Sequence, residues 1–412
     1  MTEQTASKVP QIRFKGFDAA WEDKAIGEGL LEKKRPIVLR DHQKYELITV
    51  KRRNEGIVSR GHLFGRDILV KNYSQLQTGD FVISKRQVVH GATGMIPPEL
   101  DGAIVSNEYL VAVNSSKLLT KFLTILASLP AMRRKFFLSS YGVDIEKLFF
   151  DAEDWKKRDI TIPATAEQTK IGEYFREVDR LIGLHQRKHD KLVTLKKAML
   201  QKMFPQPGAT TPEVRFKGFS SPWDSIEMEK LGQTYSGLFG KTKDDFGRGG
   251  GRFVTYMGVF NHAISNINMT AVIGVDPSQN EVRQGDVLFT ISSETPHEVG
   301  MSSVWSEDTE NVYLNSFCFG FRPIPSLHSD FLAYVFRANE FRKRICFLSQ
   351  GISRYNISKS KVLKIPVSIP SPEEQQKIGT YFRTLDELIT KHATQLQKLQ
   401  QIKSACLEKM FV

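Results

Sequence analysis

The sequence predicts an α+β protein with two repeated mixed α/β domains, joined by two long helices that form an antiparallel coiled coil with pseudo-two-fold symmetry. Three observations support this prediction. The chain contains a long internal repeat, both copies end in a heptad-patterned stretch, and the segments before these stretches carry strand-like and helix-like patterns. A chain of 412 residues, of which 40% are hydrophobic, is long enough for two or three domains with separate cores.

The repeat is clearest at its two ends. Residues 9–21, which contain Arg-Phe-Lys-Gly-Phe and end in Trp, recur at 211–223. Residues 167–204 recur without a gap at 374–411. Because the middle segments have diverged, the pattern favours a fixed frame that carries two different recognition surfaces over simple duplication of one domain.

The first middle segment is predicted to be mixed α and β. Enrichment in β-branched and aromatic residues between Gly, Asn and Asp predicts strands at 46–50, 81–84 and 103–113. Residues 117–138 have a helical pattern that is interrupted near Pro130. In the second middle segment the same signals predict a helix at 330–348, and strands at 252–260, 287–292, 302–305 and 316–322.

The two matched blocks at the ends of the repeats are predicted to be helices. Their apolar residues alternate by four and three over about five heptads, which is typical of a coiled coil. Since a whole domain separates the helices, we expect them to pack antiparallel. The predicted interface consists of Ile171, Phe175, Val178, Ile182, His185 and Leu192 in the first helix, and of Ile378, Phe382, Leu385, Ile389, His392 and Leu399 in the second.

Two-fold symmetry predicts the pairing inside this interface. Residue 185 + k would face residue 392 − k, which places His185 beside His392 at the centre. His185 and His189 are expected to belong to a buried polar layer that sets the register, because no third ligand completes a metal site. The same rule places Val178 opposite Leu399 and Leu192 opposite Leu385.

These elements divide the chain into five predicted segments. The first mixed domain covers 9–163, the central helix 164–204, a linker 205–213, the second mixed domain 211–370 and the C-terminal helix 371–412.

Composition limits the class of protein. Lys and Arg number 58 against 46 Asp and Glu, so the net charge is +12, which favours a polyanionic partner such as nucleic acid. The three cysteines form no Cys-x-x-Cys pair, which argues against a disulfide framework and a structural zinc site. No apolar run of membrane-spanning length and no apolar signal core is present, so we expect a cytoplasmic protein without a membrane partner.

Catalytic motifs are missing from the sequence. Lys241 follows a glycine as in a phosphate loop, but Tyr235 stands where that motif requires its first glycine. Neither Asn-Pro-Pro-Tyr nor Asp-Pro-Pro-Tyr, the motifs with which amino-methyltransferases hold the target amine, occurs. We therefore predict no catalytic residue, no metal site and no cofactor bound by this chain.

Basic and polar residues in predicted loops are the candidates for DNA contact. Lys and Arg neutralise phosphates, whereas Arg, Gln and Asn can bond base edges. Gln87 and Asn356 are the candidate base readers. The full predicted set is Lys51, Arg52, Arg53, Lys85, Arg86 and Gln87 in the first domain, and Lys241, Lys243, Arg248, Arg252, Arg354, Tyr355 and Asn356 in the second.

The order of these motifs matches a known pattern. Each copy opens with Arg-Phe-x-Gly-Phe and Trp, and passes through Ile-Pro and Glu-Gln-x-x-Ile at 162–171 and 369–378 into the long helix. Gly-Ile-Ser-Arg-Tyr-Asn at 351–356 precedes the second helix, whereas the first copy has Gly-Val-Asp-Ile-Glu-Lys at 142–147. In this order the chain resembles the specificity subunit of type I restriction–modification systems.

The resemblance implies a division of labour. Each mixed domain would be a target-recognition domain that reads one half of a split double-stranded DNA site, while the paired helices set the spacing and dock modification subunits. The family's subunit is non-catalytic. DNA adenine methylation with S-adenosylmethionine belongs to the modification subunits, and ATP and Mg²⁺ belong to the restriction/translocase subunits. A stand-alone DNA-binding regulator, a coiled-coil scaffold and a self-sufficient nuclease or methyltransferase are the alternatives.

Overall fold

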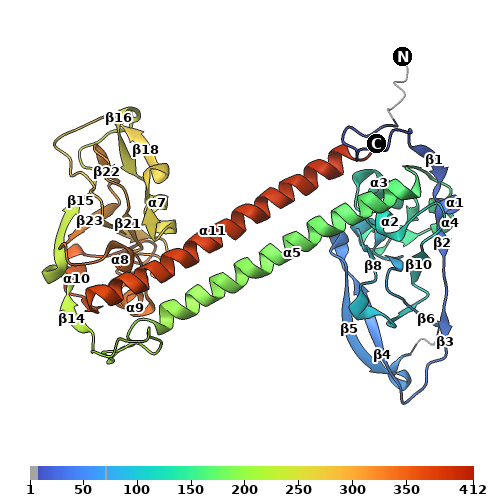
Figure 1. Cartoon of the computed structure of the whole chain (residues 1–412), viewed down its shortest axis with the longest axis horizontal. Helices are drawn as coiled ribbons and strands as arrows, with labels where there is room; N and C mark the ends of the chain where they lie inside the picture. The colour runs from blue at the N-terminus through green and yellow to red at the C-terminus, as the bar shows by residue number, and fades with distance from the viewer. Residues whose placement is uncertain (1–7, 70–71) are drawn as a thin grey trace. The chain divides into compact units, whose positions relative to one another are not determined.

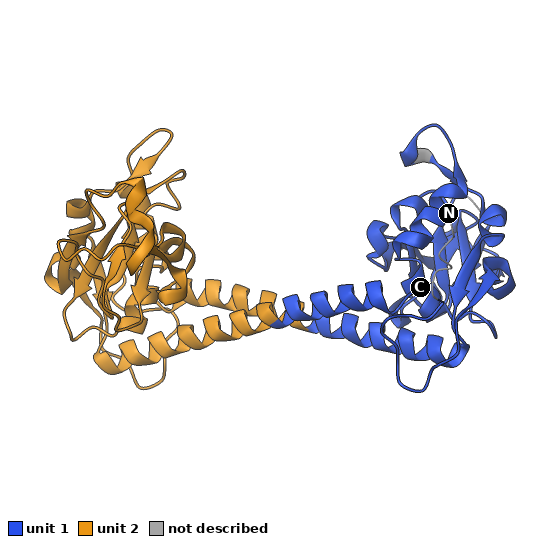
Figure 2. Cartoon of the chain, turned by 90° about the horizontal axis from the view of Figure 1, so that it is seen from above, with its two compact units in different colours: residues 1–184, 395–412 blue, residues 185–394 orange. Residues whose placement is uncertain are grey.

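The computed structural model describes residues 8–69 and 72–412 (Figure 1). The chain forms two compact units, drawn in two colours in Figure 2. Unit 1 consists of Met1–Leu184 together with Gln395–Val412, and unit 2 of His185–Thr394. Each unit thus takes part of both predicted long helices, whereas the sequence had placed those helices in segments of their own. In the described part of the chain, no helix has the length and apolar character needed to cross a membrane.

Unit 1 is built around two sheets (Figure 1). The strands predicted at 46–50 and 81–84 belong to these sheets, as β4 and β7. One sheet has the order β2-β10-β7-β8, formed by Leu31–Glu32, Tyr109–Val113, Phe81–Ser84 and Thr93–Met95. The other has the order β3-β6-β9-β4-β5, formed by Pro36–Ile37, Tyr73–Gln75, Ile104–Ser106, Lys44–Val50 and Ile57–Phe64.

Helices and short strands complete unit 1. The predicted interruption near Pro130 is confirmed, because Pro130 starts a new helix at a position where its missing N–H costs nothing. The ends of the mixed domain are tied together by β1, Glu22–Ala25, which pairs antiparallel with β13, Asp159–Ile162. The other elements are α1 (Ile26–Gly29), α2 (Thr120–Leu126), α3 (Pro130–Leu138), α4 (Ala152–Lys156), β11 (Ser140–Tyr141) and β12 (Phe149–Phe150).

The predicted single strand at 103–113 is wrong. The chain forms β9, turns at Asn107 and Glu108, and continues as β10 in the other sheet of the unit. Both halves are rich in β-forming residues, so local propensity gave one continuous strand. The turn depends on which neighbours each half pairs with, and those neighbours are distant in the sequence.

Unit 2 repeats the arrangement with different strands. Its larger sheet has the order β15-β23-β19-β21-β17, formed by Gly232–Ser236, Cys318–Pro323, Val287–Thr290, Ser302–Trp305 and Ile264–Ser265. A second sheet has the order β18-β16-β22, formed by Thr270–Ile273, Phe246–Val254 and Val312–Leu314. Strand β14, Asp224–Glu227, pairs with β25, Pro366–Ile369, as β1 pairs with β13 in unit 1.

A second predicted strand, in unit 2, is too long. The strand predicted at 252–260 ends at Val254, and α7, Tyr256–Asn261, follows. The Thr255 hydroxyl accepts a hydrogen bond from the Gly258 N–H and caps this helix. The other elements are α6 (Met228–Leu231), α8 (Ser329–Val335), α9 (Asn339–Leu348), α10 (Lys359–Leu363), β20 (Ser292–Ser293) and β24 (Tyr355–Asn356).

The two matched blocks form long helices, as predicted. Helix α5 runs from Thr165 to Lys202 and α11 from Pro372 to Lys409. Inside each unit, side chains near the beginning of one helix contact side chains near the end of the other. The contacts in unit 1 are Tyr174 Oη to Cys406 Sγ at 3.3 Å and Lys403 Nζ to Asp179 Oδ1 at 2.6 Å, and in unit 2 Lys196 Nζ to Asp386 Oδ1 at 2.5 Å.

The histidines at the predicted centre of the interface lie in contact. The Nδ1 atoms of His185 and His392, both in unit 2, are 2.9 Å apart, as the two-fold rule predicts. The layer is partly exposed rather than buried. His189 lies outside this contact and pairs with its neighbour Asp190 at 3.1 Å. Leu192 packs against the core cluster that contains Leu385, whereas the pairing of Val178 with Leu399 stays a prediction.

The predicted interface residues divide into two groups. The residues nearest the start of each helix are buried in the core of a unit, so part of the heptad stripe serves as domain core. These are Ile171, Phe175 and Val178 in unit 1, and Ile378, Phe382 and Leu385 in unit 2. The others, Ile182, His185, Leu192, Ile389, His392 and Leu399, are half-buried.

An identical clamp fixes the start of each long helix. In unit 1 the Arg13 guanidinium donates to both carboxylate oxygens of Glu167, each at 2.7 Å. In unit 2 Arg215 donates in the same way to Glu374, again at 2.7 Å twice. The carboxylates are 2% and 1% exposed, so these are buried charges that depend on their partners. Both carboxylates also lie in the first turn of their helices, where a negative charge is stabilised by the helix dipole.

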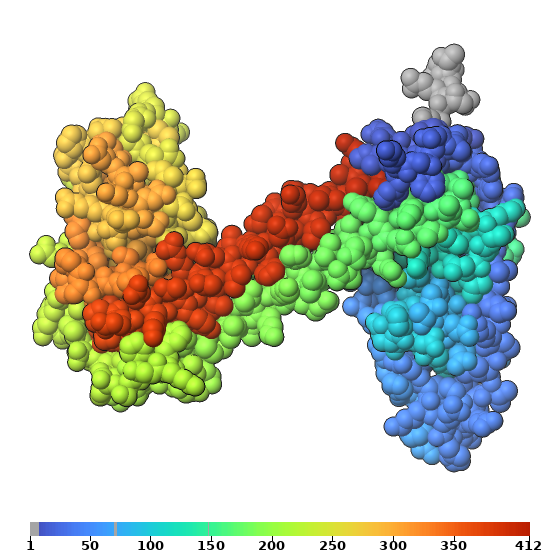
Figure 3. All heavy atoms as spheres, in the orientation of Figure 1, coloured from blue at the N-terminus to red at the C-terminus, as the bar shows by residue number. Residues whose placement is uncertain are grey.

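The end of each long helix is buried against the opening segment of a repeat. In unit 1 the ring of Phe411, which follows α11, lies 5.9 Å from that of Trp21. In unit 2 Phe204, which follows α5, lies 6.2 Å from Trp223. Figure 3 shows the red end of α11 against the blue opening segment of unit 1. The repeated blocks thus form the same core in both units, and the diverged segments are free to differ.

Candidate nucleic-acid interface

In unit 1 the structure brings together predicted residues from two loops. Lys51, Arg52 and Arg53 lie in the turn between β4 and β5, and Arg86 and Gln87 follow β7. The Arg52 Nε donates to Gln87 Oε1 at 2.8 Å, which joins the two loops. In this arrangement Gln87 supports Arg52 through its amide oxygen. Its role as a base reader, which needs both its oxygen and its NH₂ group, stays a prediction.

The loop between β11 and β12 reaches the same place. Its Glu146 accepts a hydrogen bond from Arg52 Nη2 at 2.7 Å, and its carboxylate lies 3.6 Å from His90 Nε2. This loop is the segment in which the first repeat departs from the Arg-Tyr-Asn of the second. Both partners of the Arg52–Glu146 pair are about half exposed. Because exposed ion pairs contribute little free energy, a phosphate can replace Glu146 at small cost.

Arg86 and Lys85 are anchored beside this loop. Arg86 Nε donates to Glu108 Oε2 at 2.8 Å, and its guanidinium lies 5.5 Å from the ring centre of Phe149. Lys85 Nζ donates to the Asn107 carbonyl oxygen at 2.9 Å. The turn that separates β9 from β10 therefore positions both cations.

One further cation belongs to this surface and was missed. Arg133 of α3 donates through Nη2 to Asn54 Oδ1, 3.3 Å away, beside Arg53. The sequence signal was the Arg-Arg-Lys run at 133–135, which lies in a predicted helix and was not considered with the loops. We define the unit 1 basic face as Lys51, Arg52, Arg53, Arg86, Gln87 and Arg133.

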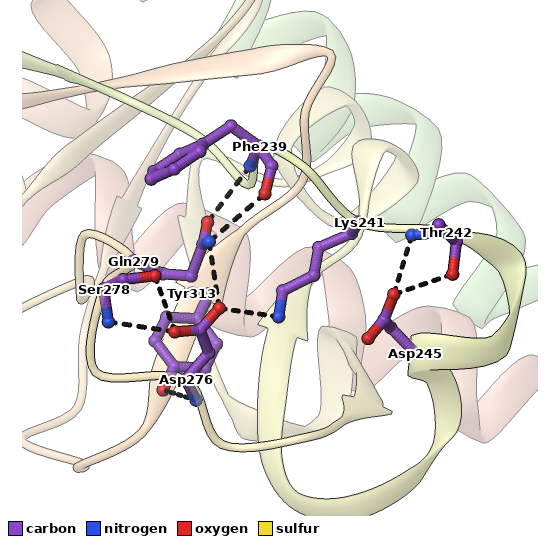
Figure 4. Close-up of polar contacts among 8 residues, drawn as sticks. All are labelled: Phe239, Lys241, Thr242, Asp245, Asp276, Ser278, Gln279 and Tyr313. Atoms are coloured by element: carbon purple, nitrogen blue, oxygen red, sulfur yellow. Dashed lines mark hydrogen bonds and ion pairs between the residues drawn. The ribbon is translucent and has the colours of Figure 1, made fainter.

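In unit 2 the predicted residue Lys241 is engaged inside the unit. Figure 4 shows its ammonium directed at Asp276, with Nζ 2.7 Å from Oδ2. The Lys241 side chain is 15% exposed. This ammonium, with hydrogen bonds from Ser278, holds the pKa of Asp276 well below its usual range. Gln279 donates to Asp276 and to the Phe239 carbonyl oxygen, so Lys241 and Gln279 together join the loop at 239–241 to the loop at 276–279.

The neighbouring predicted cations differ from Lys241 in exposure. Lys243 and Arg248 are exposed, although Arg248 Nε donates to the Asp244 carbonyl at 2.8 Å. Arg252 is partly buried, and its Nε donates to Thr270 Oγ1 at 2.5 Å. The pairing of β16 with β18 shifts between Phe246 and Gly251, so a glycine-rich bulge presents Arg248.

The Arg354-Tyr355-Asn356 group lies in a different loop of unit 2, between α9 and α10. The backbones of Gln350 and Asn356 bond each other in both directions, and this closes a tight loop. Gly351 has φ +145°, and a Cβ there would lie 1.9 Å from the Arg354 carbonyl oxygen, so only glycine fits. The Arg354 side chain is exposed. Within the described residues, no bond joins this loop to the Lys241–Arg252 loop.

No metal centre accompanies these surfaces in the described part of the chain. Residues 8–69 and 72–412 contain no group of three or more His, Cys, Asp or Glu side chains placed to hold a metal ion. Cys318, Cys346 and Cys406 are free. The exposed basic residues in the loops of both units suit contact with a polyanion.

Comparison with known protein families finds a match within the second half of the chain. Residues 260–401 match the family model described as the type I restriction modification DNA specificity domain. Over these residues the chain is similar to that domain. The matched stretch includes the Arg354–Asn356 loop and most of α11, whereas the Lys241–Arg252 loop precedes it.

A curated relative matches a shorter stretch of the chain. The type I restriction enzyme MjaIX specificity subunit of Methanocaldococcus jannaschii is 29% identical over 96 residues, which are 23% of this chain and 22% of that protein. The matched stretch thus spans less than a quarter of this relative.

Solved structures resemble the whole chain in fold. The S subunit of the type I restriction–modification system from M. genitalium has a TM-score of 0.55 at 13% identity, with 98% of this chain and 99% of that chain covered. The HsdS subunit from Thermoanaerobacter tengcongensis has a TM-score of 0.46 at 18% identity, with 95% and 96% covered. The first likeness supports the fold of the chain.

Proposed function

We propose that this chain is the non-catalytic DNA specificity subunit of a type I restriction–modification complex. The observation that carries the proposal is the specificity domain at 260–401. Its frame recurs in unit 1, where Arg13 clamps Glu167 as Arg215 clamps Glu374. Each unit therefore reads one half of a bipartite site in double-stranded DNA.

The surfaces of the two units support different half-sites. The unit 1 basic face combines the β4–β5 turn with the loop after β7, whereas unit 2 presents Arg354 and the bulge of β16. Arg and Lys from such loops position the protein on phosphates, and a subset of them contacts base edges. Because the surfaces of the two units consist of different residues, each unit reads a different DNA half-site.

Helices α5 and α11 form an antiparallel coiled coil with pseudo-two-fold symmetry in this proposal. They set the spacing of the half-sites and dock the modification subunits. The heptad pattern, the His185–His392 contact and the ion pairs inside each unit support it.

The reaction itself belongs to partner chains. DNA adenine methyltransferase subunits bind S-adenosylmethionine and flip the target adenine out of the stack. Restriction/translocase subunits use ATP and Mg²⁺. The complex works where the DNA is, in the cytoplasm. The residues of this chain contribute binding, sequence choice and positioning.

The proposal is tested by mapping methylated adenines in cells with and without the gene. We expect a bipartite methylated sequence that disappears on deletion and returns when the gene is restored. The chain is also expected to co-purify with a methyltransferase subunit. An unchanged methylation pattern would exclude the proposed function. DNA cleavage or methylation by the purified chain alone, with Mg²⁺ and S-adenosylmethionine, would point instead to a self-sufficient enzyme.

The spacing role is tested separately by lengthening α5. Four residues inserted near its end at Lys202 add about 6 Å to the helix, nearly two base-pair steps. We expect the same two half-sites with a longer unread gap between them. An altered half-site with an unchanged gap would contradict the spacing role and leave DNA recognition intact.

A further inference from the structure

The turn between β4 and β5 has an unusual backbone for its sequence. The Glu55 N–H donates to the Arg52 carbonyl at 3.3 Å, which places Arg53 and Asn54 at the two central positions of a tight turn. Their φ angles are +59° and +57°. Positive φ at both central positions is the mark of a type I′ turn, the turn that suits the twist of a hairpin.

Arg53 is a poor residue for this position. Type I′ turns favour Asn-Gly, Asp-Gly or Gly-Gly, because the Cβ of other residues is crowded at positive φ. Among the described non-glycine residues, positive φ occurs at Arg53, Asn54 and Asn311. Asparagine tolerates this conformation, whereas arginine has no local interaction that compensates. Glycine at position 53 would form the same turn without this cost.

Contacts outside the hairpin hold the turn in place. The Asn54 N–H donates to the Gly91 carbonyl at 2.8 Å, and Asn54 Nδ2 donates to Thr93 Oγ1 at 2.8 Å. Arg133 Nη2 donates to Asn54 Oδ1 at 3.3 Å. Asn54 is thus bonded to two other parts of unit 1, and the backbone at Arg53 is fixed by its neighbour.

The Arg53 side chain stands apart from the other arginines of the unit 1 basic face. Arg52 is paired with Gln87 and Glu146, and Arg86 with Glu108. Arg53 is exposed, and the described residues give its guanidinium neither an ion pair nor a hydrogen bond. Arg53 thus adopts a strained backbone without a polar side-chain contact among the described residues that would compensate, and strained backbone of this kind is concentrated at functional sites.

We infer that Arg53 reads a guanine in the half-site bound by unit 1, and that the strained turn fixes its direction. This inference rests on the proposed function. A phosphate contact tolerates a mobile side chain, since it needs charge alone. A bidentate contact with guanine O6 and N7 depends on the direction in which the side chain leaves the backbone, and a rigid turn fixes that direction. The neighbouring Lys51, whose ammonium makes no ion pair or hydrogen bond with the described residues, contacts a phosphate.

The experiment compares three variants of the full chain, each in complex with its methyltransferase subunits. Arg53→Gly removes the Cβ from a positive-φ position, and we expect a higher Tm. The same variant is expected to lose discrimination at one guanine position by roughly 5- to 150-fold. Arg53→Lys keeps the charge and the strained backbone. It should lose the same discrimination at an unchanged Tm, with the slope of log affinity against log salt preserved.

Lys51→Ala is the matched control from the same turn. It should lower the magnitude of the salt slope by about 0.9 and weaken binding to all sequences alike. The readouts are Tm, affinity for a panel of half-site variants and the methylated sequence in cells. Unchanged discrimination in both Arg53 variants would overturn the inference, while wild-type methylation of a bipartite site would still support the proposed function. A wild-type complex that methylates no bipartite site would instead count against the proposed function itself.

Discussion

The loop after α3 in unit 1 and the loop after α9 in unit 2 occupy the same place in the repeat and carry opposite charges. In unit 1 Glu146 accepts a hydrogen bond from Arg52 at 2.7 Å, so the loop supports cations that come from other loops. In unit 2 Arg354 is exposed, so the loop itself presents the cation. The frame thus fixes where a loop begins and ends, and the diverged residues decide whether it supports the reading surface or forms part of it.

The largest test of this comparison exchanges a whole middle segment. Replacing residues 25–162 with the matching segment of a relative should replace one half-site and leave the other intact. The reason is that each mixed domain is closed by its own strand pair, β1 with β13 and β14 with β25. Sequencing of methylated DNA gives the result. A change in both half-sites, or in neither, would mean that the units do not read independently.

A second test disrupts the Arg215–Glu374 clamp and leaves the recognition loops unchanged. Arg215→Ala leaves the Glu374 carboxylate, 1% exposed, without its partner. Loss of one member of a buried pair costs about 3–5 kcal/mol, so unit 2 should unfold at a clearly lower temperature. Lys202→Ala, which removes an exposed pair with Glu213, is the control and should cost at most about 1 kcal/mol. Equal effects of the two substitutions would contradict the role of the clamp.

The opposite charges of the two loops predict opposite effects on DNA binding. Glu146→Gln frees Arg52 for a phosphate, so the salt slope should become steeper by about 0.9. Arg354→Ala should make it shallower by the same amount. Glu153→Gln removes an exposed carboxylate paired with Lys156 and serves as the control. If both loops act in the same direction, the contrast between the units is wrong.

The smallest expected effect concerns the histidines. Burial and the nearby His185, with further repulsion from Lys188, Lys391 and His189, lower the pKa of His392. Protonation therefore favours the unfolded chain, where this pKa is about 6.5. The stability contributed by neutral His392 is complete above that pH and is lost as the pH falls through the lower, folded pKa.

Replacing His185 and His392 with leucine removes this dependence. We expect a Tm higher by roughly 2–4 °C for each kcal/mol gained, and less change of Tm between pH 7 and pH 5. Thermal unfolding at several pH values measures both. A lower Tm at pH 7 would show that the pair contributes more than register.

The sequence predicted the frame well because its signals are local or repeated. The heptads gave α5 and α11, and the recurrence of Arg13 and Glu167 as Arg215 and Glu374 was visible before their contact was known. The contact itself joins residues 154 positions apart, so it required the structure. Sequence comparison of the two copies could have proposed it, since both residues recur within matched blocks.

The recognition surfaces were harder to predict because their chemistry depends on distant partners. Lys241 lies in a basic loop that the sequence marks as a candidate for DNA contact. In the structure its ammonium is paired with Asp276, 35 residues away. Arg133 was assigned to a helix, and its position beside Arg53 follows from tertiary packing. A charge in a sequence shows what a residue can bind, whereas its partners decide what remains available.

The core of unit 1 includes residues that are synthesised after unit 2, so the order of synthesis affects when this core can form. The core around Trp21 and Phe122 includes Met410 and Phe411, which are made after every residue of unit 2. During translation, unit 2 therefore has all of its core before unit 1 does. Until then the apolar residues of unit 1 lack their last partners, a condition in which nascent chains associate with chaperones. A premature stop a few codons before Met410 would therefore destabilise unit 1, although most of unit 1 is translated before unit 2.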